Sequence, residues 1–355
     1  MSPGTVRDVR LTVMERLVGF VPVRYWASCL ILSFLVGPPM QFISALADTG
    51  SLDRAFLFTF NPSTGASGEF TTSTLGIVFQ LTWTLNLFVV YYLPRFMRTR
   101  LTEYESHLAP VSSGGVVSIA RHFDAIYRFW PVIVLAAVLS TLSWTYVSLQ
   151  LVYIVGVVSL SYLLLSNGLV MVIFSGFIWV YFSALWGLYK LGKEPLMLKS
   201  VDADVMLGLR PIGSISFSLF LAFISVVVLS LIGVLVNPDT VSLASLFVLA
   251  LLGGVMFFLP LNSFHKQMLA VRRKEEGDLF QRLAEMSNRG EGGAEQEVDL
   301  LRSIRDVQLL QMRKDRLSKV PTWPFDTQLF GRFAAIILSV TAILLSRIIS
   351  VFLHI

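Results

Sequence analysis

The chain alternates between long apolar stretches and short polar segments. A membrane-spanning helix needs about 20 mostly apolar residues, because its backbone must satisfy its own hydrogen bonds within hydrocarbon. Stretches of this kind occur at residues 26–46, 74–92, 129–148, 168–190, 215–236, 242–261 and 329–352. We therefore predict an all-α fold, a polytopic α-helical membrane protein of about seven spans.

One apolar stretch does not fit this count. Residues 149–165 are as hydrophobic as their neighbours, yet one more simple span would place Lys190 and Lys193 outside. Three interpretations stay open: a re-entrant or interfacial helix, an extension of the neighbouring helices, or a true eighth span.

Orientation follows from the basic residues, which favour the cytoplasmic side of a membrane. They gather before the first predicted span, after the second, after the fourth and after the sixth. Seven spans put all of these segments on one side. We expect a multi-pass protein of the cell membrane, with its N-terminus in the cytoplasm and its C-terminus outside.

Residues 1–25 form the first predicted domain. Val6, Val13, Leu17 and Phe20 fall on one side at helical spacing, which is typical of an amphipathic interfacial helix. A helical cap packed on the bundle explains the pattern equally well. A third interpretation is cleavage after residue 47, where Ala45-Leu46-Ala47 resembles a signal-peptidase site, although the segment before it is long for a signal peptide.

The next predicted domain, residues 26–262, is the transmembrane bundle, with about six spans and the ambiguous segment. Residues 263–325 are the one sizeable polar region, and a Gly-rich turn at residues 289–293 divides it. Apolar residues recur at helical spacing on both sides of the turn, which predicts a cytoplasmic helical hairpin. Residues 326–355 supply the last transmembrane helix. A hairpin that merely joins two spans is as consistent with this pattern as a signalling arm.

Composition supports the membrane class. Only 14% of the 355 residues are charged and 55% are hydrophobic, whereas soluble domains carry about 25% charged residues. The net charge of +5 suits cytoplasmic segments that face anionic lipid, so we infer a lipid partner and no nucleic acid.

Few residues suggest chemistry. Cys29 stands alone, the four histidines lie far apart, and the predicted spans hold no acidic or histidine side chain that would activate a nucleophile. We therefore expect no cofactor, no metal and no enzymatic activity.

Three sets of residues are candidates for a polar path. Arg347 lies in the last predicted span, where a charge must face protein, water or headgroups, and snorkelling to the interface is its simplest explanation. Ser339, Ser346 and Ser350 share one face of that span, which indicates either a packing seam or a hydroxyl-lined path. The second predicted span offers Gln80, Thr84 and Asn86, which suit a cavity or hydrogen bonds between helices.

Two functional hypotheses follow. The first is a homo-oligomeric ion channel or pore, in which these polar faces meet water. The second is a non-transporting membrane sensor or scaffold, whose hairpin binds a cytoplasmic protein partner.

Overall fold

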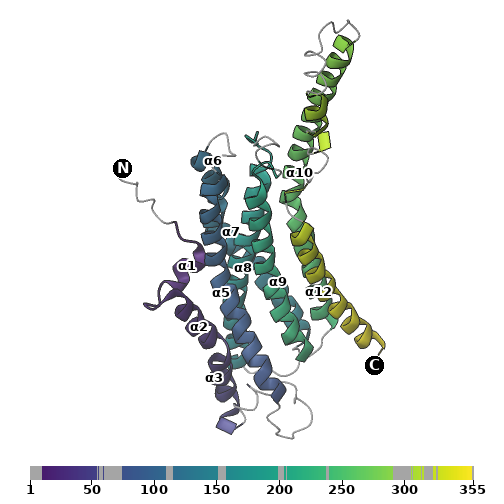
Figure 1. The fold of residues 1–355 in the computed structure, drawn as a ribbon. Coiled ribbons are helices and arrows are strands. Elements are labelled where there is room, and N and C mark those ends of the chain that lie inside the picture. Colours follow the sequence, from purple (N-terminus) through teal and green to yellow (C-terminus); the bar gives the residue numbers. More distant parts are fainter. Residues whose placement is uncertain are drawn as a thin grey trace.

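The computed structural model describes residues 10–53, 55, 59, 74–108, 115–150, 157–198, 204, 206–236, 240–290, 305, 307–312, 314–315, 323–324 and 327–353. Ten α-helices and one 3₁₀ helix make up this part of the chain, so the predicted all-α fold is confirmed. The helices form an elongated bundle from which α10 projects at one end (Figure 1).

The first three helices lie on one side of the bundle. They are α1 (Val13–Val18), α2 (Tyr25–Val36) and α3 (Pro38–Thr49). Gly37 separates α2 from α3, because the residue before a proline is disfavoured in helical geometry while Pro38 suits the first helical position.

The centre of the bundle follows. Helix α5 (Thr74–Leu108) leads to α6 (Gly115–His122) and to the 3₁₀ helix η1 (Asp124–Tyr127). Helix α7 (Trp130–Gln150) then packs along α8 (Val157–Leu191), and α9 (Arg210–Val236) packs on α5. Because α7 ends at Gln150 and α8 begins at Val157, the described parts of the ambiguous segment extend these two neighbours.

The last two described helices are α10 (Thr240–Gly290) and α12 (Thr327–Leu353). Helix α10 has 51 residues, about 76 Å at 1.5 Å per residue, and it continues through Pro260. This length exceeds a hydrocarbon core of about 30 Å, so its second half extends well beyond any membrane-spanning part.

Five described helices are long and apolar enough to cross a membrane: Ile77–Glu105, Leu164–Leu191, Arg210–Leu235, Ser242–Arg282 and Gln328–Ser350. The prediction of seven spans is therefore corrected to about five. The other two stretches form the shorter apolar helices Tyr25–Met40 and Trp130–Thr145. The first is interrupted at Gly37 and Pro38, a break that hydropathy does not detect.

The helix predicted from the spacing of Val6, Val13, Leu17 and Phe20 is shorter in the structure, since α1 has six residues; residues 1–9 lie outside the described part. Met14 is fully buried, and a Cβ added at Gly176 of α8 would come within 2.4 Å of its Cε atom. Val13 of the predicted apolar side is buried as well, whereas Leu17 and Phe20 of that side are 39% and 83% exposed.

Candidate functional site

The polar residues predicted on α5 lie inside the bundle. Gln80 and Asn86 are buried and Thr84 is half-buried. The Gln80 side-chain amide donates to the Thr59 carbonyl at 2.7 Å, and that of Asn86 donates to Ser230 Oγ on α9 at 2.9 Å. The Asn86 contact joins α5 to α9, and the Gln80 contact joins α5 to Thr59.

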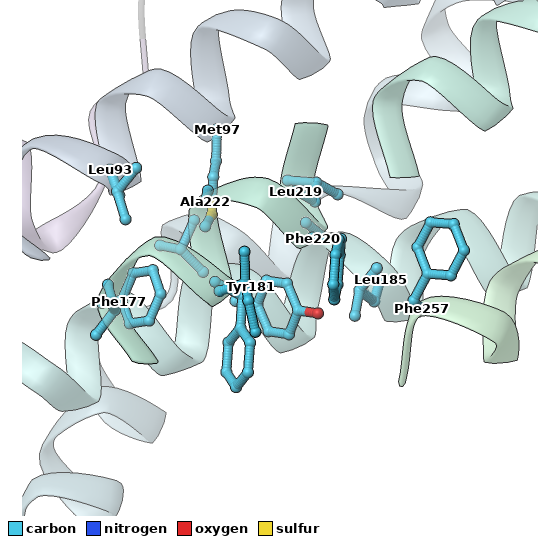
Figure 2. Close-up of a cluster of buried hydrophobic side chains, with 14 of the residues drawn as sticks. Leu93, Met97, Phe177, Tyr181, Leu185, Leu219, Phe220, Ala222 and Phe257 are labelled. Carbon is cyan, nitrogen blue, oxygen red and sulfur yellow. The ribbon is translucent and has the colours of Figure 1, made fainter. Parts of the chain in front are cut away.

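Nearer the end from which α10 projects, the bundle is filled by apolar side chains. Figure 2 shows Tyr181 of α8 among Phe177, Leu185, Phe220 and Ala222, with Met97 of α5 close by. Tyr181 stacks on Phe223 at 4.6 Å, and both rings are at most 2% exposed. Along α5, buried Leu93 and Met97 lie between Asn86 and Tyr104, whose hydroxyl contacts that of Ser214 at 3.0 Å.

The candidates on α12 occupy a different place. Ser339, Ser346 and Arg347 are exposed, and Ser350 is half-buried. Only 17% of the apolar part of α12 is buried, against 56% of α8, so α12 is a peripheral helix. Because α12 packs mainly on α10 and α5 packs on α8 and α9, the structure does not bring the two candidate sets together.

The exposed face of α12 carries a stripe of small and polar residues, which we call the α12 stripe. Its members recur at helical spacing and, apart from half-buried Ser350, are exposed: Gln328, Arg332, Ala335, Ser339, Ala342, Ser346 and Ser350. Arg347 lies at the edge of this face, about 80° around the helix from Ser339 at roughly 100° per residue. Gln328 and Arg332 were not among the predicted residues, although their spacing from Ala335 and Ser339 places them on the same face.

The opposite face of α12 is held by aromatic side chains. Phe333 stacks on Phe257 of α10 at 4.4 Å and lies 4.7 Å from Phe220 of α9. Before the helix, Trp323 stacks on His265 of α10 at 4.4 Å and meets Phe258 edge-on. These contacts fix the rotation of α12 about its axis, so the stripe points away from the bundle.

Charged groups concentrate at the end of the bundle from which α10 projects. Arg98 of α5 forms an ion pair with Glu15 of α1 at 2.8 Å, and Arg10 pairs with Asp124 of η1 at 2.7 Å. Burial raises the pKa of Tyr127 beside them, so this phenol stays neutral at physiological pH. The Glu15–Arg98 pair also escaped the sequence analysis, because its partners are far apart in the chain.

Within the described residues, no three His, Cys, Asp or Glu side chains gather in a way that would hold a metal ion. Comparison with protein-family models, with curated proteins and with solved structures finds no match to this chain. The α12 stripe is the most distinctive polar surface among the described helices.

Proposed function

We propose that the protein is a multi-pass membrane protein that assembles as a homo-oligomer, in which the α12 stripe lines an aqueous pore. In this proposal the protein conducts ions and catalyses no reaction. The observation that carries it is the exposure of the stripe along an otherwise apolar helix.

The length of the stripe fits this role. From Gln328 to Ser350 it covers 22 residue steps, about 33 Å at 1.5 Å per residue, which matches the thickness of a hydrocarbon core. Lipid tails offer no partner to an amide, a guanidinium or a row of hydroxyls, so such a face suits water or another protein chain better than lipid.

The flanks of the stripe suit contacts between subunits. Leu338, Leu345 and Ile349 lie beside it and are 48–69% exposed. Small residues between such large ones let helix backbones approach closely. Ser339 donates its hydroxyl hydrogen to the Ala335 carbonyl at 2.8 Å, so its oxygen can still accept a hydrogen bond from water.

Charge indicates the selectivity of such a pore. Arg332 lies near the first turn of α12 and Arg347 near the last, and both are exposed. Rings of positive side chains attract anions and repel cations. The proposed pore therefore prefers anions.

Orientation is part of the proposal. The C-terminal ends of α5 and α8 lie at the end from which α10 projects (Figure 1), and Arg95, Arg98, Lys190 and Lys193 are in or just after these parts of the chain. We assign this end to the cytoplasm by the preference of basic residues for that side, with the last residues of α12 outside.

Cysteine accessibility in reconstituted protein tests the proposal. Cys29 is the one cysteine and is buried, so Cys29→Ala provides the background. We expect Ser339→Cys and Ser346→Cys to react with a charged, water-soluble thiosulfonate and to lose most anion flux. The control is Val340→Cys on the buried face, which should stay unmodified. The pore proposal would be overturned if the protein were monomeric, or if modification of the stripe left the anion flux unchanged.

The part of α10 that projects from the bundle supports a second candidate function, a membrane sensor or scaffold. We call two parts of the chain the arm: α10 beyond residue 264, and the described residues between 305 and 315. They approach each other where Lys314 Nζ lies 5.7 Å from the centre of the Phe280 ring. Leu279 and Leu310 are buried, which supports the hairpin, but Phe280, Leu309 and Met312 are 56–60% exposed. Exposed apolar side chains outside a membrane suit a protein partner.

The two candidates respond differently to changes in the arm. Phe280→Ser with Leu309→Ser should abolish capture of a partner and leave anion flux intact, if the arm is a docking surface only. Loss of flux with unchanged assembly would instead assign the arm to gating of the pore.

A further inference from the structure

Three arginines near the cytoplasmic end of α5 have different partners. Arg98 pairs with Glu15, and Arg100 pairs with Glu103 at 3.1 Å. Arg95 instead lies over the ring of Tyr25 of α2, with its guanidinium carbon 4.4 Å from the ring centre. Among the described residues, no carboxylate comes within ion-pair distance of Arg95, so its charge lacks an anionic partner.

Tyr25 holds this guanidinium in place. The Tyr25 hydroxyl donates to the Tyr91 carbonyl of α5 at 3.0 Å, which fixes the ring between the two helices. A guanidinium over an aromatic face keeps the N–H groups at its edge available, and these donors match two oxygens of a phosphate. Arg95 is exposed, so such a ligand can reach it.

The depth of Arg95 matches that of lipid headgroups. It lies 18 residue steps beyond the exposed Ile77, or about 27 Å at 1.5 Å per residue. A hydrocarbon core is about 30 Å thick. Trp26 is 52% exposed and Tyr92 is 38% exposed beside it, as expected of aromatic side chains at the interface.

An apolar track runs along α5 away from Arg95. Ile77, Leu81 and Tyr92 lie on the same side of the helix as Arg95 at helical spacing, and they are 45%, 65% and 38% exposed. A phosphate bound at Arg95 would have this track beneath it. The track has the chemistry of an acyl-chain contact, which free phosphate does not need.

We infer that Arg95, held on Tyr25, binds the phosphate of an anionic phospholipid in the cytoplasmic leaflet. The inference rests on the proposed placement of this end in the cytoplasmic headgroup region. The lipid supplies the anion that the described residues do not, and its acyl chain covers the apolar side of α5. Arg98 and Arg100 are already paired and take no part.

The test uses delipidated full-length protein in detergent and native mass spectrometry with phosphatidylglycerol or phosphatidylcholine as the probe. Wild type should bind phosphatidylglycerol about fivefold more tightly, because one basic group near a membrane surface contributes about 1 kcal/mol. Arg95→Gln should lose this preference, and Tyr25→Ala should weaken it. Arg100→Gln is the matched control and should keep it.

Further arms separate the alternatives. Tyr25→Phe keeps the ring but loses its hydrogen bond to Tyr91, so it should keep more of the preference than Tyr25→Ala. Arg95→Lys should retain part of the preference, which guards against a general folding defect. Inorganic phosphate should not displace the lipid; full displacement would assign the site to a free anion. Equal preference in wild type and Arg95→Gln would overturn the inference. Subunit number and anion flux, measured on the same samples, report separately on the proposed pore.

Discussion

Arg98 of α5 holds Glu15 of α1 through two hydrogen bonds to one carboxylate oxygen. Its Nε and Nη2 donate to Glu15 Oε1 at 3.0 and 2.8 Å. The other oxygen, Oε2, accepts from the backbone N–H and the hydroxyl of Thr12, each at 3.0 Å. The carboxylate is 3% exposed and has four donors, so α1 is tied to the bundle by a satisfied, buried charge.

We predict that removing one partner of this pair destabilises the protein. Glu15→Gln or Arg98→Met leaves the other charge buried, which typically costs about 3–5 kcal/mol. The apparent melting temperature in detergent should fall clearly for both. Arg100→Gln breaks an exposed pair and should cost at most about 1 kcal/mol. Equal melting of Glu15→Gln and Arg100→Gln would show that the α1 contact contributes little.

The residues around α1 show which contacts can be predicted from the sequence and which cannot. Thr12 and Glu15 have the spacing of a capping box, and the structure forms both of its hydrogen bonds, so the start of α1 could have been predicted from these residues. Arg98 could not have been assigned to Glu15, because 83 residues separate them and only tertiary packing brings them together.

For the long helices, too, the sequence predicts the position and the polar face of a helix but not what that face contacts. Hydropathy located every long apolar helix but missed the break at Gly37, where geometry and not polarity ends α2. Periodicity placed Ser339, Ser346 and Ser350 on one face of α12. It did not decide whether that face meets the bundle, and the packing of Phe333 on the opposite face does.

A pair of adjacent glycines tests how α10 packs. A Cβ at Gly253 would lie 2.3 Å from Cε1 of Phe223, whereas one at Gly254 would lie 3.5 Å from Cδ1 of Ile337. Gly253→Ala should therefore push the buried ring of Phe223 aside and destabilise the protein by about 1–3 kcal/mol. Gly254→Ala makes an ordinary contact and gains helix propensity, so its melting temperature should match or exceed that of wild type. The reverse order would contradict the packing of α9 against α10.

Phe333 and Phe330 test the attachment of α12. Phe333 is 6% exposed and meets Phe220, Phe257 and Phe258, whereas Phe330 is 46% exposed. Truncation of a buried phenylalanine typically costs about 3–5 kcal/mol, so Phe333→Ala should loosen α12 and speed its proteolysis in detergent. Phe330→Ala should leave the digestion pattern unchanged. Similar digestion of both variants would mean that this aromatic contact does not hold α12.

Orientation is tested by labelling from each side of the membrane. Cysteines placed at Ser67 and at Gly292, both outside the described residues, should react from opposite sides in the Cys29→Ala background. We expect Ser67→Cys to react from outside, because the segment around Ser67 has few basic residues. Gly292 instead lies in a segment rich in lysine and arginine, which favours the cytoplasmic side. Reaction of both from one side would refute the proposed orientation.

The two exposed arginines of α12, Arg332 and Arg347, test the proposed pore most directly. Replacing either one by glutamate reverses the sign of its charge and should therefore change the ion selectivity. If they lie near its mouths, their positive charge raises the local anion concentration, and the reversal potential of reconstituted wild type should indicate anion preference. Arg347→Glu and Arg332→Glu should each shift that potential towards cations, with the alanine variants in between. High salt should reduce the shift, because the screening length falls from about 10 Å at 0.1 M to about 3 Å at 1 M. If Arg347 only snorkels to the outer interface, Arg347→Lys and Arg347→Gln will both keep the selectivity, while Arg332→Glu alone will move it. If neither Arg347→Glu nor Arg332→Glu changes the reversal potential, the current does not pass along the α12 stripe.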